Sequence, residues 1–481
     1  MTTASGRDIQ EFQMGRSAGR PGKRALLVIS DLHLGGAPET DGKPSFQMCS
    51  PAGRTQLAKF IDYAAEQQSV DRDVTLILAG DIVDFLAEEA FVPFTAQDAI
   101  ACQKLERIME RTAEAWQSLR RFAASGSKLV LLLGNHDIEL SLPGPRRMLL
   151  ETLGPGRIEF IYDNQAFVDG PVIIEHGNRY DSWNIVSHDG LREVRSAMSR
   201  GETPPAFEGP AGSSMVVNII NRIKSQFPFV DLLKPEDAGL LPLLAVLDPS
   251  SMNEATKAIG LWRKQSQAKF AESGIPLDMA NIGTLSVNDE PLIDLAMELY
   301  GDQSNIGVVD NVKNFYELWQ LARSANDKDA QLQKLYVALR ARAQSTWQTF
   351  DVNREAEQYL NPAHAAAKRG FKVVVYGHTH LVKRVALDNQ GSVYLNSGTW
   401  ADLMQVPEAV LRGDDPAAKE QLRGFVNDLA ENKLQNWRRQ VPTFVRVELD
   451  GDAVTAADVH FFDGASKTDR VPNGRLTRLS V

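Results

Sequence analysis

The sequence predicts an α/β layered domain that is interrupted by a large helical insertion, and two observations lead to this fold class. Five short apolar runs rich in Val, Ile and Leu are spaced along the chain, each bounded by polar residues or glycine. Such runs are typical of strands buried on both faces of a sheet. Stretches with helical periodicity separate the first three runs, and strand–helix–strand alternation indicates a layered α/β domain. The runs are ALLVIS (25–30), VTLILAG (74–80), KLVLLLG (128–134), PVIIEHG (171–177) and FKVVVYG (371–377).

The helical stretches also define the expected organisation of the chain. Helical periodicity is clear at 54–67 and 100–125, and it dominates from about residue 183 to 367, where strand-like runs are absent. Strand-like segments return at the C-terminal end. We therefore expect a disordered tail (1–22), the first part of the core (23–182), a helical insertion (183–367), the second part of the core (368–400), a small helical insert (401–440) and C-terminal β segments that complete the core (441–481).

Composition limits the classes of function. The chain has 481 residues, a net charge of −10 and no basic stripe, which argues against a surface that grips long nucleic acid. Its two cysteines, Cys49 and Cys102, provide no disulfide framework, and a reducing, cytoplasmic location is expected. The most apolar late stretch, GLLPLLAVL (239–247), is too short to span a bilayer. We therefore expect a soluble protein; peripheral contact with a membrane is left open, and so is the oligomeric state.

Each of the five apolar runs ends in side chains that can bind a metal ion. Because ligands gather beyond the carboxyl ends of strands in layered α/β folds, we expect these side chains to meet at one place. The chain has only 8 histidines, and five of them follow these runs, so coincidence is a poor explanation. The candidate residues are Asp31 and His33; Asp81 and Asp84; Asn135, His136 and Asp137; His176; and His378 and His380.

The spacing and the types of these residues predict the kind of metal site. In an extended segment residues i and i+2 point the same way, so Asp31 and His33 can face one cluster, as can His378 and His380. Mixed carboxylate, imidazole and amide ligands suit Mn²⁺, with Fe or Zn²⁺ as alternatives. Asp81 is the natural bridging ligand, because one carboxylate can hold two cations about 3.5–4 Å apart.

In order and type, the five motifs resemble those of the calcineurin-like metallophosphoesterases. The resemblance covers roughly 22–182 and 368–400, and it implies a four-layer αββα sandwich with two divalent metal ions. It further implies two sets of ligands that share Asp81. One ion would be held by Asp31, His33, Asp81 and His380, and the other by Asp81, Asn135, His176 and His378.

The resemblance also suggests catalytic roles. Two cations lower the pKa of a water molecule and clamp phosphate oxygens during in-line attack. His136, next to Asn135, is placed to protonate the departing oxygen or to stabilise the pentacovalent centre, with Asp84 or Asp137 accepting from its other ring nitrogen. Arg179 is the candidate for binding the substrate phosphate, because a guanidinium matches phosphate bidentately; its alternative interpretation is a solvated loop arginine.

The substrate is less defined. The continuation after His176 is similar to relatives of the UDP-2,3-diacylglucosamine pyrophosphohydrolases, although those enzymes commonly carry Arg in place of His136 and have far shorter inserts. The insertion enters just after His176 and returns before His378, so we expect it to act as a cap beside the metals. Its apolar segment at 214–233 suits either an acyl chain or a membrane surface, or else forms the insertion's own core.

The function predicted is hydrolysis of a phosphodiester, phosphomonoester or pyrophosphate bond in a small molecule, with nucleotide-linked and lipid-linked substrates as candidates. Two alternatives remain. A metal-dependent nuclease is disfavoured by the acidic balance and the lack of an aromatic stacking platform. A non-catalytic scaffold that binds partners through the insertion is disfavoured because the full ligand set and His136 are present.

Overall fold

The computed structural model describes residues 22–40, 45–247, 327–341, 343–413, 416–464 and 468–476. The tail expected at 1–22 thus lies, except for Gly22, outside the described residues. The part of the expected helical insertion at 248–326 lies outside them as well.

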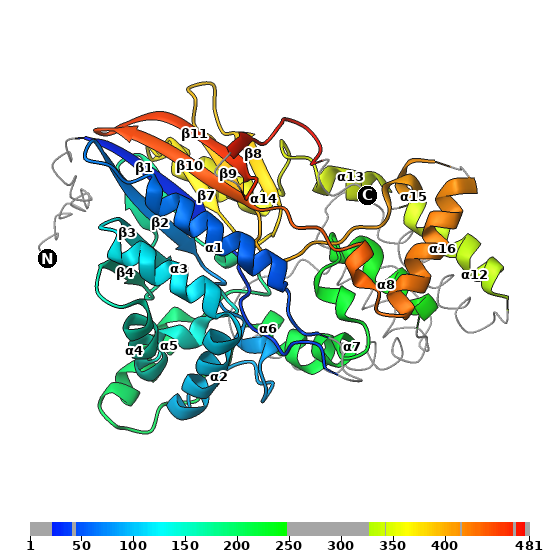
Figure 1. Cartoon of the computed structure of the whole chain (residues 1–481), viewed down its shortest axis with the longest axis horizontal. Coiled ribbons are helices and arrows are strands. Elements are labelled where there is room, and N and C mark those ends of the chain that lie inside the picture. Colours follow the sequence, from blue (N-terminus) through cyan, green and yellow to red (C-terminus); the bar gives the residue numbers. More distant parts are fainter. Residues whose placement is uncertain are drawn as a thin grey trace, which may run out of the picture.

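Two β-sheets form the centre of the protein (Figure 1), and each of the five apolar runs contributes one strand to them. The first sheet has seven strands, in the spatial order β12 (Thr468–Arg470), β11 (Ala453–Phe462), β10 (Thr443–Asp450), β1 (Lys23–Ile29), β2 (Arg72–Ala79), β3 (Lys128–Leu132) and β4 (Arg157–Ile161). The second has five, in the order β5 (Phe167–Asp169), β6 (Val172–Ile174), β7 (Val373–Tyr376), β9 (Val393–Ser397) and β8 (Val382–Ala386). The strands that carry the motifs run parallel to their motif-bearing neighbours: β1, β2 and β3 in one sheet, and β6 and β7 in the other.

Alternate residues of the apolar runs face different layers, which explains why these runs are apolar throughout. In β1, Leu27 and Ile29 pack with the helices of the first layer. Leu26 and Val28 instead pack against residues of the second sheet, such as Val375 of β7. Both faces of the strand are therefore buried, as expected for a sheet inside a sandwich.

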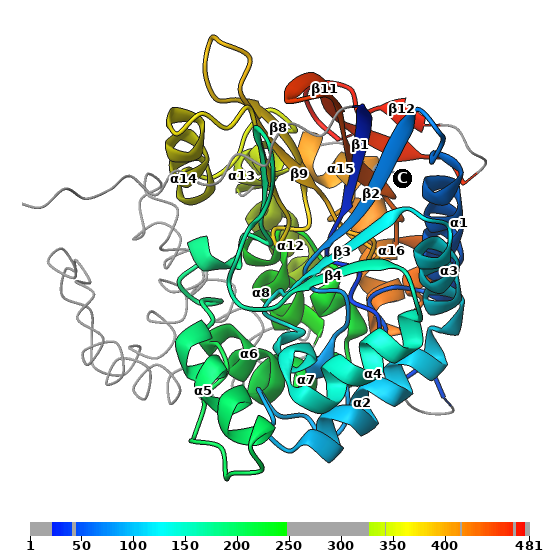
Figure 2. The same cartoon turned by 90° about the vertical axis from the view of Figure 1, so that its left-hand side faces the viewer.

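Helices cover the outer face of each sheet and complete four layers. α1 (Pro51–Glu66), α2 (Asp98–Arg111), α3 (Ala113–Ala124) and α4 (Pro143–Leu153) pack on the seven-stranded sheet. α14 (Glu357–Lys368) packs on the five-stranded sheet through Tyr359 and Ala363. Figure 2 shows the layers in sequence, from α14 through β8 and β9 to β1 and β2 and then α1 and α3. The predicted αββα sandwich is confirmed.

Local chemistry explains where the observed elements differ from the expected ones. The periodic stretch 100–125 forms two helices that are separated at Thr112. The Thr112 hydroxyl donates to the carbonyl of Ile108 at 2.7 Å and accepts from the Trp116 indole at 3.0 Å, so this side chain bonds locally at the break. The strands β4, β5, β8 and β12 are short and lie at the edges of the sheets. They contain polar residues, so they were not among the predicted apolar runs.

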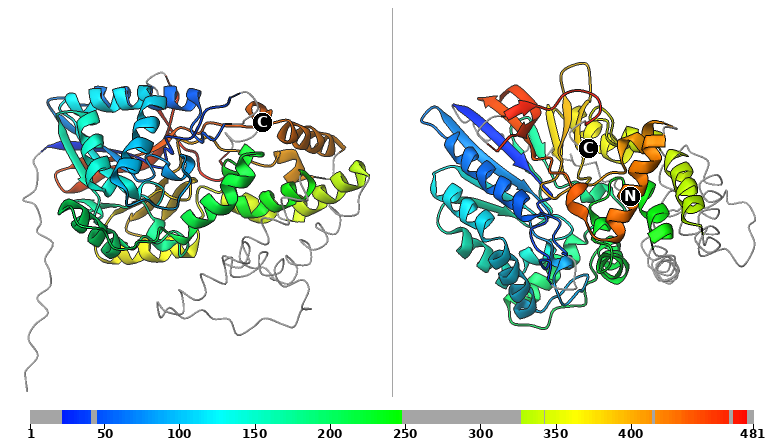
Figure 3. Two further views of the ribbon diagram at one scale, coloured as in Figure 1. Left: turned by 90° about the horizontal axis from the view of Figure 1, so that it is seen from below. Right: turned by 45° about the vertical axis from the view of Figure 1, so that its right-hand side comes forward.

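The helical insertion and the 401–440 insert form one helical unit with a shared core. α8 (Glu236–Leu247), α12 (Lys328–Ala341), α15 (Glu408–Arg412) and α16 (Pro416–Ala430) pack together at one end of the molecule (Figure 3). Five apolar residues of 214–233, the segment that suggested a lipid-facing cap, are buried in this core: Ile223, Phe229, Val230, Leu232 and Leu233.

The helices at the two borders of the expected insertion belong to the sandwich instead. α5 (His188–Ser199) packs on the first helical layer through Leu191 and Val194, and α14 covers the second sheet. The other elements of the inserts are α6 (Ala211–Met215), the π-helical turn η4 (Val216–Ile220), α7 (Asn221–Lys224), η5 (Pro228–Asp231), α13 (Ala343–Thr349) and η6 (Leu434–Asn436). Among the described residues, no helix is long and apolar enough to cross a membrane.

Candidate metal centre

The ten residues predicted from the strand ends come to one place between the carboxyl ends of the two sheets. Asp31 and His33 follow β1; Asp81 and Asp84 follow β2; Asn135, His136 and Asp137 follow β3; His176 follows β6; His378 and His380 follow β7. Both sheets therefore contribute to a single cluster, in which the candidate ligand atoms form groups within 4.8 Å of one another.

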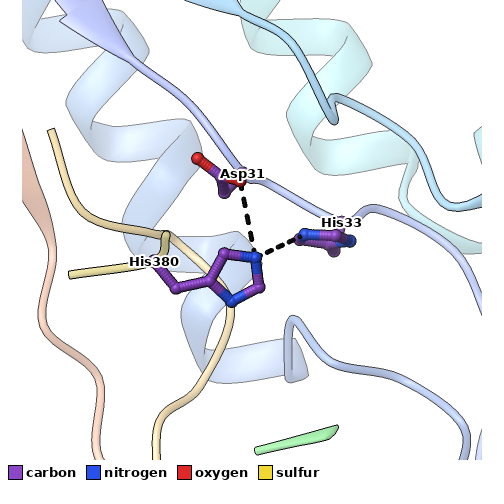
Figure 4. Close-up of side chains that lie close together, drawn as sticks. All are labelled: Asp31, His33 and His380. Carbon is purple, nitrogen blue, oxygen red and sulfur yellow. Dashed lines mark hydrogen bonds and ion pairs between the residues drawn. The ribbon is translucent and has the colours of Figure 1, made fainter. Parts of the chain in front are cut away.

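The first group consists of Asp31, His33 and His380, all buried (Figure 4). The Nε2 atoms of His33 and His380 face each other at 3.0 Å, and His380 Nε2 lies 3.4 Å from Asp31 Oδ1. The other oxygen, Asp31 Oδ2, accepts from the Ser30 hydroxyl at 2.5 Å and from the His378 backbone N–H at 2.9 Å. These contacts hold the carboxylate so that Oδ1 faces the two imidazoles.

The second group consists of Asp81, His176 and His378. Asp81 Oδ2 lies 3.1 Å from His176 Nε2 and 3.9 Å from His33 Nε2, so this one oxygen lies between the two groups. Asp81 Oδ1 accepts from the His136 backbone N–H at 2.8 Å. This is the position that a ligand shared by two ions needs.

A chain of side-chain hydrogen bonds that the sequence did not predict connects Asn135 to the second group. Its amide Nδ2 donates to Asn184 Oδ1 at 3.2 Å, and Asn184 Nδ2 donates to Asp181 Oδ2 at 2.7 Å. The same Asp181 oxygen lies 3.0 Å from His378 Nε2. Asp181 and Asn184 both belong to the continuation after His176, and the sequence motifs assign neither of them a role at the metals; the signal that marks them is their i, i+3 spacing beyond a motif strand.

The backbone at the cluster is strained. Of the seven non-glycine residues with positive φ in the described part of the chain, five are predicted ligands: Asp31, His33, Asp81, His378 and His380. Residues other than glycine rarely adopt a positive φ. Such backbone strain persists where the surrounding structure enforces it, typically at functional sites. The strain thus marks the same residues as the motifs do.

Two glycines make room for the cluster. A Cβ on Gly134 would lie 2.0 Å from Asp81 Oδ1, and one on Gly377 would lie 2.4 Å from the Ser30 hydroxyl oxygen. Any side chain at these positions would displace a carboxylate of the cluster or its hydrogen-bond donor. The motifs therefore need glycine at these two positions, because neighbouring atoms lie too close for any side chain.

Unsatisfied polar atoms show that the cluster fits metal ions. Buried polar atoms in proteins almost always have hydrogen-bond partners. Here five predicted ligands each carry a buried polar atom that has no hydrogen-bond partner. These atoms are Asp31 Oδ1, His33 Nδ1, Asn135 Oδ1, His176 Nε2 and His380 Nδ1. Buried carboxylate and amide oxygens and imidazole nitrogens that lack hydrogen-bond partners are atoms of the kind that bind Mn²⁺, Fe or Zn²⁺.

The pKa values agree with this chemistry. Burial and the Lys234 ammonium lower the pKa of His380 well below its usual range, which favours the neutral imidazole that binds metal. Burial opposes ionisation of Asp81, but His176 and His136 lower its pKa overall. Against the effect of burial, Asp81 raises the pKa of His176 to about 10, so a metal ion at this imidazole would replace a proton.

His136 lies at the edge of the cluster beside Asp84. Its Nδ1 is 3.2 Å from Asp84 Oδ1, and its ring meets that of His33 edge-on at 4.8 Å. Burial alone would lower the pKa of His136, but Asp84 and Asp81 raise it to about 9. This shift favours the protonated form of His136 at neutral pH, which is the form that a general acid requires.

Asp137 does not contact the ring of His136. Its two oxygens accept the backbone N–H groups of Gly134 and Ile82, each at 2.7 Å, and so tie the second and third motif loops together. Of the two carboxylates expected beside His136, the structure brings only Asp84 to it.

Arg179 lies at the protein surface, next to Glu175 and Tyr180. Its side chain is half exposed, with the guanidinium 3.8 Å from Glu175 Oε1 and 5.7 Å from the ring centre of Tyr180. Glu175 also accepts from the Tyr180 hydroxyl at 2.8 Å. Arg179 belongs to this surface arrangement, which fits its alternative interpretation as a loop arginine.

A four-layer sandwich in which both sheets direct carboxylate, imidazole and amide groups to one strained cluster defines a metal-dependent phosphoesterase. Residues 25–205 match the family model of the calcineurin-like phosphoesterases, and the chain carries a domain of this family. It is therefore a hydrolase of phosphoric esters. The match ends before His378 and His380, which the fold adds to the site through β7. No curated protein matches the chain.

Proposed function

We propose that the chain hydrolyses a phosphoester or pyrophosphate bond of a small molecule at a centre of two divalent cations, with Mn²⁺ as the first candidate. The observation that carries the proposal is the position of Asp81 Oδ2, which lies between imidazoles of two ligand groups drawn from two sheets. Asp31, His33, Asp81 and His380 would hold one ion; Asp81, Asn135, His176 and His378 would hold the other.

When bound, the two ions would activate a water molecule and neutralise charge on the phosphate oxygens. The chain's own residues supply the remaining functions. Ser30 and the His378 backbone orient Asp31, and Asn184 orients the Asn135 amide. His136, protonated and placed beside Asp84, donates a proton to the departing oxygen.

An acyl chain is not part of this proposal. Five of the apolar side chains at 214–233 that favoured one lie in the core of the helical unit, namely Ile223, Phe229, Val230, Leu232 and Leu233. The substrate is therefore proposed to be recognised by its phosphate group and by polar residues near the metals.

Hydrolysis of bis-p-nitrophenyl phosphate tests the proposal. The purified protein is stripped with EDTA, assayed, and assayed again after Mn²⁺ is added. We expect activity to be lost and then restored, and Asp81→Asn to abolish both activity and metal binding. The matched control, Asp388→Asn in an exposed loop, should behave as the wild type. Activity that survives complete metal removal would contradict the proposal.

A further inference from the structure

Asp181 contacts the second ligand group but is not one of its members. Its Oδ2 lies 3.0 Å from His378 Nε2 and accepts from Asn184 Nδ2 at 2.7 Å, and its Oδ1 accepts from the Trp183 backbone N–H at 3.0 Å. Both oxygens therefore have partners in the protein. The predicted ligand Asp31 differs in this respect, because its buried Oδ1 has none. These contacts suit a residue that holds metal ligands rather than one that binds the metal.

The contact with Asp181 fixes how the ring of His378 is presented. A carboxylate only accepts hydrogen bonds, so the ring nitrogen that faces it has to carry the proton. In His378 this nitrogen is Nε2, and the lone pair of the neutral ring is then on Nδ1. A metal ion binds histidine through the nitrogen without a proton, and the hydrogen bond of the other nitrogen determines which one that is. Asp181 thus leaves Nδ1 of His378 for the second ion.

The same carboxylate fixes the orientation of two side-chain amides. Asn184 has to turn its NH₂ group to Asp181, which directs its Oδ1 to Asn135. That oxygen accepts from Asn135 Nδ2 at 3.2 Å, so Oδ1 of Asn135 is left without a partner in the protein. Reversal of either amide would bring two donors or two acceptors together. The atom that Asn135 presents to a metal ion therefore depends on Asp181.

The insertion packs against the middle of this chain of hydrogen bonds. Gly212, in α6, donates its backbone N–H to the Trp183 carbonyl at 2.8 Å. A Cβ on Gly212 would lie 2.3 Å from Asn184 Oδ1 and 3.1 Å from Asn184 Cγ. The backbone of α6 therefore confines the Asn184 amide on this side. The first helices of the insertion thus support ligands of one particular ion.

The first ligand group is held by other contacts. Asp31 Oδ2 accepts from the Ser30 hydroxyl and from the backbone N–H of His378, and neither contact involves the side chain of Asp181 or of Asn184. A change in the Asp181 side chain should therefore affect the two ions unequally.

We propose that Asp181 is a positioning residue for the second ion, and that it acts through His378 on one side and through Asn184 and Asn135 on the other. The inference rests on the proposed function and goes beyond it by giving the two ions different supports. It also gives the insertion a role at the metal centre, since Gly212 confines Asn184.

Titration of the EDTA-stripped full chain with Mn²⁺, followed by isothermal titration calorimetry, tests the inference without turnover. Asp181→Asn keeps the size of the side chain but can turn an N–H group toward His378 or Asn184. It should weaken binding of the second ion about 10–100-fold, as expected when a partner that orients metal ligands is lost. The first ion should bind as in the wild type. Asp71→Asn, at an exposed position before β2, is the matched control and should not differ from the wild type at either site.

Electron paramagnetic resonance adds a readout that a general loss of stability would not reproduce. Two neighbouring Mn²⁺ ions give an exchange-coupled spectrum, whereas a single ion gives the hyperfine lines of isolated Mn²⁺. At a concentration that fills both wild-type sites, Asp181→Asn should show the spectrum of the isolated ion. Gly212→Ala should show it too, because the added methyl group displaces the Asn184 amide.

Wild-type affinity for both ions in Asp181→Asn would overturn the inference. Equal weakening of both ions would assign Asp181 to general support of the fold, and would overturn the inference as well. If this variant does not fold, Asp181→Ala is judged by the same two criteria. A coupled spectrum in Gly212→Ala would remove the role of the insertion.

The two proposals fail in different ways. A wild-type protein that binds two Mn²⁺ ions, the second in an Asp181-dependent manner, but hydrolyses no ester would remove the proposed function and leave the positioning role. A wild-type protein that hydrolyses esters, while Asp181→Asn binds both ions normally, would remove only the role of Asp181.

Discussion

At the scale of single residues, the metal centre depends on how little room the backbone leaves around Asp81. Gly134 approaches this carboxylate so closely that a methyl group would lie 2.0 Å from Oδ1 and 2.6 Å from Cγ. Asp81 would have to move, and it is the residue whose Oδ2 lies between the two ligand groups. The glycine therefore controls the position of the shared ligand.

We predict that Gly134→Ala weakens Mn²⁺ binding at least about tenfold, because displacement of a ligand or of its supporting contacts costs this much affinity. Gly424→Ala is the matched control. Gly424 is exposed on α16, where a Cβ meets nothing within 4 Å, so the substitution should leave metal affinity unchanged. Calorimetric titration of the stripped proteins with Mn²⁺ makes the comparison. Equal affinity in the two variants would show that Asp81 is not held by this contact.

His136 and Asp84 make a second prediction at this scale. If protonated His136 is the acid, kcat/KM should fall as pH rises through its pKa of about 9. Asp84→Asn removes a charge that raises this pKa, so the falling limb should move to lower pH. His136→Ala should keep both metals and lose about 10²–10⁴-fold in rate on an alkyl phosphate ester.

The leaving group distinguishes an acid from a positioning residue. p-Nitrophenolate is a stable anion and can depart without being protonated. His136→Ala should therefore lose much less activity on bis-p-nitrophenyl phosphate than on the alkyl ester. Equal losses on both substrates would assign His136 to binding or to support of the metals. If kcat/KM of Asp84→Asn falls at the same pH as that of the wild type, then Asp84 does not control the pKa of the group that donates the proton.

Residue spacing explains which parts of the site can be read from the sequence. Asp31 and His33, or His378 and His380, are neighbours along the chain at the end of an apolar run, and their convergence needs only parallel strands. Asn184 is different, because its contact with Asn135 is a hydrogen bond between side chains 49 positions apart in the sequence. Local spacing alone does not predict which residue it contacts. Arg179, although close to His176 in the sequence, lies half exposed beside Glu175.

At the scale of elements, the two inserts that are separate in the sequence share one core. Phe425 of α16 is fully buried and packs against Trp437 at 4.8 Å between ring centres, and α16 contacts both α8 and α12. Helical periodicity predicts that such segments are helices but not which helices pack together. It likewise did not show that α5 and α14, at the borders of the insertion, belong to the sandwich.

We predict that Phe425→Ala destabilises the whole helical unit by about 3–5 kcal/mol, the usual cost of truncating a buried aromatic side chain. Amide hydrogen exchange should become faster in α8 and α12 as well as in α16, while β1 and β7 stay protected. Asn427→Ala, at an exposed position of the same helix, is the control. Faster exchange confined to 401–440 would mean that the two inserts are independent units.

At the scale of the whole molecule, the metal centre joins the two sheets. Asp31, His33, Asp81 and Asn135 come from the seven-stranded sheet, whereas His176, His378 and His380 come from the five-stranded sheet. Between the sheets lies an apolar core that includes Val28 and Val375. Ions bound at the cluster would therefore bridge two layers that are otherwise held together by apolar packing, by the connecting chain and by salt bridges such as Arg24–Asp169 and Arg384–Asp458.

Because the ligands come together only in the folded protein, metal binding should stabilise the fold. A ligand at a free concentration of about 100 times its Kd adds about 2.7 kcal/mol to the free energy of unfolding. We predict that Mn²⁺ raises the melting temperature of the EDTA-stripped protein, and that His176→Ala and Asp31→Asn each reduce the rise, although they lie on different sheets. Scanning calorimetry across a series of Mn²⁺ concentrations measures the effect, with Lys59→Ala on the exposed face of α1 as the control. A rise that is lost in one of these two variants and fully kept in the other would place the stabilising ion on a single sheet, and the sandwich would then hold together without a metal bridge.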